Sequence, residues 1–321
     1  MHAISPYRRR FLESMSRCRA WFIQSALVIV LGCVLSSAAG SQSSVAGYDE
    51  SIFRKRIPND QLTFLTAFDG RVSGELVRDK QFRKLMHTAV PDCMFHYGRD
   101  MPLMDALEMV LNHSLTPVQV RDGRYLTVSG QSGPYLRGRG FLWIDMQEGI
   151  VLGGFYFHPV NGEPTPTVAV FSKQVKEDTL QMSQLPREFW EDLTSWSSRL
   201  GVPPITTRYF ITGSNRRILL EHDEDYCAPA NGAAVPPAGD CRQMDAEAAD
   251  IDETAAYYLD QVNYATNATA WMIGQDQIAW LVVRDNTCRS VADPLGCHIR
   301  VTREHTRIII HRHPMPHPLS R

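Results

Sequence analysis

The residues best suited to chemistry stand together in the run His222-Asp223-Glu224-Asp225-Tyr226-Cys227. One imidazole and three carboxylates are ligands that a hard cation would accept. The run lacks the spaced Asp-x-Asp pattern and the Gly turn of a cation-binding loop, and a charged run at the end of a hairpin is more typical of a solvated loop. The sequence therefore predicts no metal ion here.

Other catalytic patterns are missing from the chain. It holds no Gly-x-Ser-x-Gly, His-Glu-x-x-His, phosphate-loop or dinucleotide-binding motif. The eleven His are scattered or belong to residues 311–321, a proline-rich stretch that predicts a disordered tail. We expect a protein without catalytic residues and without a cofactor.

Four of the seven Cys stand as two close pairs in the last third of the chain, Cys227 with Cys241 and Cys288 with Cys297. Neither pair has the Cys-x-x-Cys spacing of a zinc site, and paired Cys in an exported domain are typical of disulfides. Cys93, on a predicted strand, is expected to be a small buried apolar residue. The C-terminal third is thus predicted to be stabilised by two disulfides.

Residues 1–40 have the pattern of an export signal, because several Arg precede the apolar run 26–31. Three outcomes stay open. The run Val30-Leu31-Gly32-Cys33 fits a lipoprotein signal that leaves lipidated Cys33 as the N-terminus, and Ser37-Ala38-Ala39 fits ordinary cleavage. An uncleaved anchor over residues 21–35 is the third outcome, although this run is short for a membrane span. Export is expected in each case, followed by a Ser- and Gly-rich tether.

The composition describes an ordinary globular protein, with 44% hydrophobic and 21% charged residues. The length of 321 residues suggests two or three compact units. The formal net charge is -2, and because residues 1–33 hold five Arg and one Glu, the remaining chain carries -6. This mildly acidic body argues against a nucleic-acid partner, which requires a basic surface, and is compatible with a cationic protein.

Residues 50–130 are predicted to form a small β-α-β-α-β-β unit. The predicted strands are 72–77 and 93–97, the helices are 80–90 and a segment opened by Pro102, and a hairpin joins 115–120 to 125–128 across Asp122-Gly123. This order, with the run Met101-Pro102-Leu103-Met104-Asp105-Ala106-Leu107, resembles the short N-terminal domain of secretins and TonB-dependent receptors. The resemblance implies a periplasmic protein-docking module without catalysis.

Residues 130–140, rich in Gly, Ser and Arg, are expected to link this unit to a β-rich region at 141–226. The predicted strands of that region are 141–146, 150–158, 167–173, 207–212 and 216–221, and one helix begins at Pro186. The pattern predicts a central antiparallel sheet with one covering helix.

The C-terminal segments have helical periodicity. One helix is predicted from Asp245 to about residue 265. In the next segment, Ile278, Leu281 and Val282 recur at the spacing of a buried helix face, and Trp280, Arg284 and Cys288 form a neighbouring stripe. In the last segment the predicted buried face consists of Ile299, Thr302, Thr306 and Ile309. The sequence predicts packed helices in which no residue is arranged for chemistry.

These helices carry a family resemblance. The Ala279-Trp280 and Arg284-Asp285 pairs, followed by Cys288, Cys297 and the spacing Thr302-x-x-x-Thr306, resemble the C-terminal half of the lysozyme-inhibitor LprI-like domain. The upstream half would start at Cys241, so the resemblance spans residues 227–310. It implies that Trp280, Arg284, Asp285, Thr302 and Thr306 are structural motif residues. The chain departs from the family at His305, where Arg is usual, and at Thr254-Ala255, where a Leu-Asn pair is usual.

Together these features predict a multidomain α+β protein of the periplasm, free or anchored to the outer membrane as a lipoprotein. The C-terminal resemblance implies an inhibitor that occludes a lysozyme-type cell-wall hydrolase. The N-terminal resemblance implies the alternative, a docking or signalling component of a secretin or TonB-dependent receptor system. A third hypothesis is a structural envelope protein in which both modules only act as scaffolds.

Overall fold

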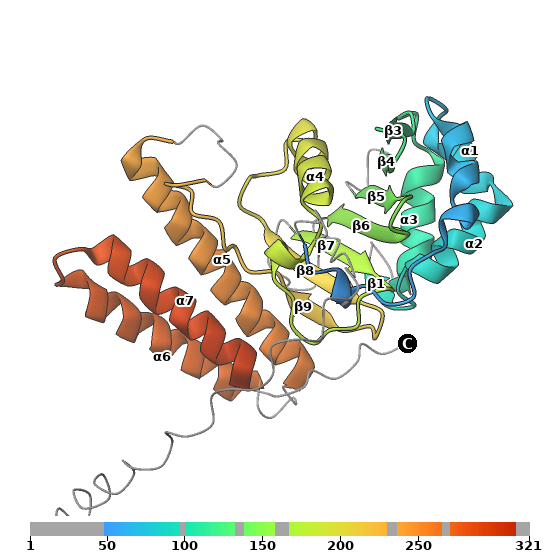
Figure 1. The fold of residues 1–321 in the computed structure, drawn as a ribbon. Coiled ribbons are helices and arrows are strands. Elements are labelled where there is room, and N and C mark those ends of the chain that lie inside the picture. Colours follow the sequence, from blue (N-terminus) through green and yellow to red (C-terminus); the bar gives the residue numbers. More distant parts are fainter. Residues whose placement is uncertain are drawn as a thin grey trace, which may run out of the picture. The chain divides into compact units, whose positions relative to one another are not determined.

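The computed structural model describes residues 48–96, 100–131, 138–157, 167–229, 236–264 and 270–312 (Figure 1). The predicted export signal with Cys33 and residues 313–321 of the predicted tail lie outside the described residues. Residues 311 and 312 of that tail are helical, so the prediction of disorder is wrong for these two residues. No helix in the described ranges combines the length and the apolar character needed to cross a bilayer.

The centre of the fold is a mixed sheet in the order β3-β4-β5-β6-β7-β8-β9. Its strands are β3 (Gln119–Arg121), β4 (Tyr125–Gln131), β5 (Arg139–Asp145), β6 (Ile150–Phe157), β7 (Thr167–Ser172), β8 (Thr207–Thr212) and β9 (Arg217–Leu219). All neighbours pair antiparallel except β7 and β8, which are parallel. Helix α4 (Arg187–Arg199) lies between these two in the chain, and a parallel pair requires such a crossover. The prediction of an antiparallel sheet is therefore wrong for the pair β7 and β8.

Helices cover both faces of the sheet (Figure 1). Helices α1 (Ser73–Arg78), α2 (Lys80–Ala89) and α3 (Leu103–Asn112) share one hydrophobic core with Leu142, and α4 shares another with Trp143. Leu142 and Trp143 are neighbours on β5, and successive side chains of a strand point to opposite faces. The pair β1 (Met94–His96) and β2 (Asp100–Pro102) forms a separate small sheet.

Within the described residues, four short 3-10 helices complete this part of the fold. They are η2 (Glu50–Ile52), η3 (Asn59–Gln61), η4 (Thr63–Phe68) and η5 (Met182–Gln184).

Residues 73–78 form a helix, so the strand predicted at 72–77 is wrong. Helix α1 packs on α3, and a Cβ atom added to Gly74 would lie 2.7 Å from the carbonyl oxygen of Asn112. Glycine is therefore required for the close approach of the two helices. The other predicted helices and strands of the first unit are confirmed, with β3 shortened to its last residues.

The linker predicted at 130–140 is also corrected. Residues 130 and 131 belong to β4, which continues to Gln131, and residues 139 and 140 belong to β5, which begins at Arg139. The two strands pair from Gln131↔Arg139 to Tyr125↔Asp145. The sheet therefore continues across the predicted boundary between the first unit and the central region.

Three long helices follow the sheet, namely α5 (Ala238–Tyr264), α6 (Ala270–Arg289) and α7 (Pro294–Arg312). They lie side by side in Figure 1. A small apolar cluster joins α5 and α7 to the sheet through Tyr209 and Leu219. Asp252 of α5 strengthens this junction, because its carboxylate accepts the backbone N–H of His222 at 2.6 Å and lies 2.7 Å from Nδ1 of the same buried residue.

Candidate functional site

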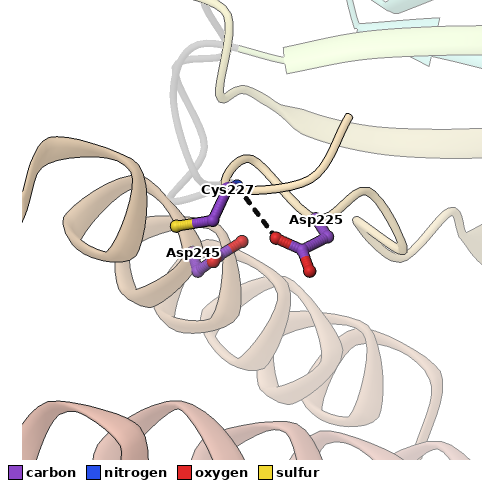
Figure 2. Close-up of side chains that lie close together, drawn as sticks. All are labelled: Asp225, Cys227 and Asp245. Carbon is purple, nitrogen blue, oxygen red and sulfur yellow. Dashed lines mark hydrogen bonds between the residues drawn. The ribbon is translucent and has the colours of Figure 1, made fainter. Parts of the chain in front are cut away.

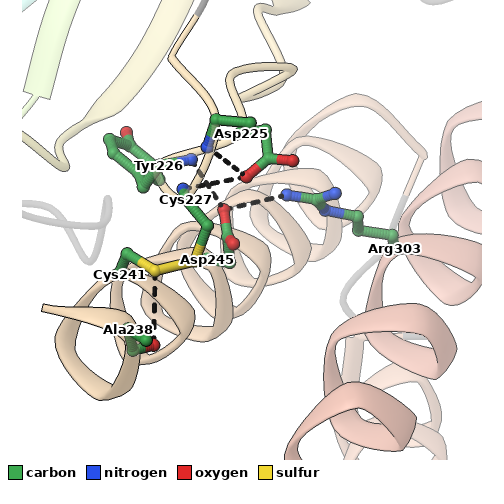
Figure 3. The surroundings of a disulfide bond; sticks show 8 residues. Asp225, Tyr226, Cys227, Ala238, Cys241, Asp245 and Arg303 are labelled. Carbon is green, nitrogen blue, oxygen red and sulfur yellow. Dashed lines mark hydrogen bonds and ion pairs between the residues drawn. A yellow bond between two sulfur atoms is a disulfide. The ribbon is translucent and has the colours of Figure 1, made fainter. Parts of the chain in front are cut away.

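Two disulfides tie the C-terminal helices, as predicted from the sequence. Cys227–Cys241 joins the segment after β9 to the first turn of α5 (Figure 3), and Cys288–Cys297 joins the end of α6 to the start of α7. In the chain-entropy model, closing loops of about 10 to 15 residues stabilises the fold by roughly 3 kcal/mol each. Cys93 is free and buried, and burial raises the pKa of its thiol to about 11.

Two residues of the acidic run at 222–227 and one residue of α5 lie close enough together to be considered as metal ligands. Ligand atoms of Asp225, Cys227 and Asp245 lie within 4.8 Å of one another (Figure 2). The sulfur of Cys227 is, however, bonded to Cys241, so it cannot serve as a thiolate ligand. Asp225 accepts the backbone N–H of Cys227 at 2.8 Å, and Asp245 lies 3.7 Å from Arg303 of α7 (Figure 3). These contacts give the two carboxylates a structural role beside the disulfide.

A partly buried polar network holds α5, α6 and α7 together at Arg284. This guanidinium donates to Asp250 of α5 at 2.8 Å, to its neighbour Asp285 at 3.0 Å and to Thr302 of α7 at 3.4 Å. His298 of α7 lies 2.8 Å from the same Asp250 carboxylate oxygen. One Arg therefore connects all three helices, which explains the structural role implied for Arg284, Asp285 and Thr302.

A second polar group surrounds the buried Glu253 of α5, three residues after Asp250. Its carboxylate accepts a hydrogen bond from Gln277 of α6 at 2.6 Å and lies 3.0 Å from Nδ1 of His305 on α7. The imidazole of His305 stacks on the indole of Trp280, with ring centroids 3.8 Å apart and planes at 10°. The departure from the family pattern at His305 is thus part of a stacked, hydrogen-bonded arrangement.

Next to this group, the three helices enclose a cavity of about 220 Å³, here named the bundle cavity. Its lining combines two carboxylates, an amide, three aromatic rings and one aliphatic side chain: Tyr257 and Asp260 from α5, Asp276, Gln277 and Trp280 from α6, and His305 and Ile309 from α7. Asp260 is only 5% exposed, whereas Asp276 is exposed and lies at the rim. The lining contains no Ser, Thr or Cys among the described residues, so it supplies no alkoxide or thiolate nucleophile.

The outer face of α6 differs from the sequence prediction. Ile278 and Val282, predicted to be buried with Leu281, are 57% and 54% exposed, and Val283 is 61% exposed. The stripe of Trp280, Arg284 and Cys288 faces the bundle instead. Arg284 contacts Asp250 of α5, Trp280 stacks on His305 of α7, and Cys288 is bonded to Cys297 of α7. Ile278, Val282 and Val283, here named the α6 apolar row, therefore lie on the surface. On α7, Thr302, Thr306 and Ile309 of the predicted face are buried, whereas Ile299 is only half-buried.

The structure brings most motif residues together and adds others that sequence reasoning missed. Trp280, Arg284, Thr302 and Thr306 lie inside the bundle, and Asp285 is at its surface in contact with Arg284. The residues that were missed are the acids of α5, above all Asp250, Glu253 and Asp260. Their spacing of three and seven residues on one helix places them on a common face and could have indicated a polar interior.

No protein-family model, curated protein or solved structure matches this chain.

Proposed function

We propose that this protein is an exported, non-catalytic envelope protein whose C-terminal helices bind and occlude a cationic, lysozyme-type cell-wall hydrolase. The observation that carries the proposal is the α6 apolar row. Monomeric proteins expose few contiguous apolar surfaces unless these serve an interaction, and an apolar centre with a polar rim is typical of an interface. The two disulfides favour an oxidising compartment such as the periplasm.

Charge complementarity favours a cationic partner. Residues 238–312 contain eleven carboxylates, seven Arg and no Lys, so the three helices are net negative. A negative surface raises the rate at which a positively charged protein meets it. The acidic helices would steer the hydrolase, and the α6 apolar row would supply the contact that excludes water.

The alternative of a docking or signalling component of a secretin or TonB-dependent receptor system has weaker support. Helix α1 replaces the first predicted strand, and β3 and β4 belong to the large sheet instead of a separate small unit. The predicted order of strands and helices, on which that resemblance depends, is therefore altered at its start, and its last two strands belong to a larger sheet.

The test is inhibition of a purified lysozyme by the purified full chain, followed as the clearing of a cell-wall suspension. We expect inhibition that saturates at an equimolar ratio. Val282→Asp places a charge at the centre of the α6 apolar row and should weaken inhibition about tenfold or more, the effect of losing an interface hot spot. Leu115→Asp is the matched control, because Leu115 is an exposed apolar residue outside the helical bundle. Equal inhibition by both variants, or none by the wild type, would refute the proposal.

A further inference from the structure

Four side chains with metal-ligating atoms converge where the segment after β9 meets the start of α5 (Figure 2; Figure 3). Asp225 and Cys227 belong to the segment, and Cys241 and Asp245 belong to the helix. Ligand atoms of Asp225, Cys227 and Asp245 lie within 4.8 Å of one another, and the sulfur of Cys241 is bonded to that of Cys227. Two sulfurs and two carboxylates therefore share one corner of the fold, here named the disulfide corner.

The backbone presents these four side chains as a tetrahedral metal site requires. Cys241 and Asp245 are four residues apart on α5, so they lie on the same face of the helix. Asp225 and Cys227 stand two residues apart in a turn, in which the amide of Ala228 donates to the carbonyl oxygen of Asp225 at 3.1 Å. Two ligands from a turn and two from one helix face are also the arrangement of a Cys2His2 zinc finger, and Zn²⁺ accepts both thiolate and carboxylate ligands.

Both carboxylates of the disulfide corner are already oriented by hydrogen bonds. Oδ1 of Asp225 accepts two backbone N–H groups, that of Cys227 at 2.8 Å and that of the next residue at 3.1 Å. Oδ1 of Asp245 accepts the backbone N–H of Tyr226 at 3.3 Å and lies 3.7 Å from the guanidinium of Arg303. Hydrogen bonds of this kind fix ligating carboxylates in metal sites, and a nearby Arg offsets part of the negative charge of the ligands.

The state of the two sulfurs decides whether the disulfide corner can hold a metal ion. While the Cys227–Cys241 bond is intact, there is no thiolate to bind one. A dithiol reductant supplies two electrons and two protons, which convert the protein disulfide into two thiols while the reductant itself becomes a disulfide. A Zn²⁺ ion then displaces both thiol protons. The Cα atoms of the two cysteines are 5.0 Å apart, so rotation of the side chains can bring the sulfurs to the roughly 3.8 Å that separates two thiolates on one zinc ion.

From this geometry we infer that the disulfide corner is a redox-switched Zn²⁺ site whose four ligands are Asp225, Cys227, Cys241 and Asp245. In the oxidised protein the disulfide joins the segment after β9 to α5. In the reduced protein the zinc ion makes the same connection, so the closed loop between the two cysteines is kept. The site is independent of the α6 apolar row and of the proposed hydrolase partner.

Metal binding to the full chain in both redox states tests the site. The protein is kept oxidised or is reduced with a phosphine under argon, and bound Zn²⁺ is measured by competition with a chromogenic chelator. We expect the reduced chain to bind one Zn²⁺ with a Kd of about 1 μM or tighter, and the oxidised chain to bind about a hundredfold or more weakly because it has no thiolate. Co²⁺ in place of Zn²⁺ should give a thiolate-to-metal charge-transfer band in the reduced chain only.

The two disulfides provide a matched pair of cysteine variants. Replacing Cys227 and Cys241 by Ser should abolish zinc binding by the reduced chain. Replacing Cys288 and Cys297 by Ser should leave it unchanged, because among the described residues no group of ligands like that of the disulfide corner includes either of these cysteines. Both disulfides are open in the reduced protein, so the two variants are compared without a difference in cross-linking.

A second pair of variants tests the carboxylates. Asp225→Asn should weaken zinc binding by the reduced chain about tenfold or more. Asp223→Asn is the matched control, because it removes the same charge from another exposed residue of the acidic run that is not part of the ligand cluster. Asp225 is itself exposed, so its substitution keeps the site testable even if a cysteine variant does not fold.

Three results would overturn the assignment of the zinc site. They are binding of zinc by the reduced chain that is no tighter than by the oxidised chain, wild-type affinity after Cys227 and Cys241 are replaced by Ser, and equal affinities of Asp225→Asn and Asp223→Asn. None of them bears on the inhibition of a lysozyme, which the oxidised protein is expected to perform through α6.

Discussion

Arg284 is the residue whose replacement tests the helical bundle most sharply. Its side chain is 10% exposed and contacts carboxylates or hydroxyls of all three helices. Its Cζ atom also lies 5.2 Å from the centre of the Trp280 ring. Arg284→Met keeps the length and the apolar packing of the side chain but removes the charge and the hydrogen bonds.

The expected loss of stability on Arg284→Met is moderate. A hydrogen bond to a charged group contributes about 1.5–3 kcal/mol, and a cation over an aromatic ring about 0.5–2 kcal/mol. Two effects reduce the sum. Asp250 and Asp285 have side chains 46% and 55% exposed, so water can solvate them after the change, and the guanidinium no longer has to be desolvated. We expect a loss of about 2 kcal/mol in the stability of the bundle.

Native-state hydrogen exchange, measured by mass spectrometry on peptides of α6 and α7, reports the free energy of opening of this part of the protein. Arg300→Met is the control, because Arg300 is exposed on α7 and has no ion pair among the described residues. The control should change stability by less than about 0.5 kcal/mol. A similarly small effect of Arg284→Met, or a gain in stability, would refute the assignment of Arg284 as the junction of the three helices.

Two further predictions concern the disulfides and pH. Replacing Cys288 and Cys297 by Ser should lower the free energy of unfolding by about 3 kcal/mol, measured by urea denaturation, because a loop of about ten residues is no longer closed in the unfolded chain; an unchanged midpoint would contradict this. Burial and the charge of Asp252 raise the pKa of Glu221 above its ordinary 4.5, so the folded state binds this proton more tightly than the unfolded state and stability is lost as pH rises above that value. Glu221→Gln should therefore increase the melting temperature at pH 7 and reduce the decline in stability between pH 4.5 and 7. A lower melting temperature of the variant at pH 7 would contradict this prediction.

Sequence reasoning succeeded where the relevant information was local. Helix α4 was predicted from its apolar face and from Pro186, which stands at its N-cap. The neighbouring strands β8 and β9 were predicted from their local pattern, and they pair across a turn in which Asn215 has a positive φ of 58°. The two disulfides followed from the grouping of the Cys and the expected compartment.

Sequence reasoning failed where a segment packs against residues that lie far away in the chain. The six residues of α1 are too few for periodicity to distinguish a helix from a strand, and their conformation depends on packing against α3. The face of α6 was predicted from hydrophobicity, which favours Ile278 and Val282 as the buried residues. Its true inner face is set by Asp250, Glu253 and His305 on other helices, whose polar groups require Arg284 and Gln277 as partners.

The candidate site was therefore predicted only in part. The resemblance implies that Trp280, Arg284, Thr302 and Thr306 are structural. The structure places Trp280 and Arg284 in contact with α7, and Thr302 and Thr306 among its buried residues. The bundle cavity could not be predicted, since its lining comes from three helices and no two of its segments share a recognisable spacing. The α6 apolar row could not be predicted either, because Ile278 and Val282 were expected to be buried and are exposed.

The most direct test of the proposed contact is hydroxyl-radical footprinting of the full chain with and without a cationic lysozyme. The account predicts that oxidation of Ile278, Val282 and Val283 falls in the complex while that of exposed Leu115 stays unchanged. Unchanged oxidation of the α6 apolar row, or protection confined to α1, α2 and α3, would contradict it.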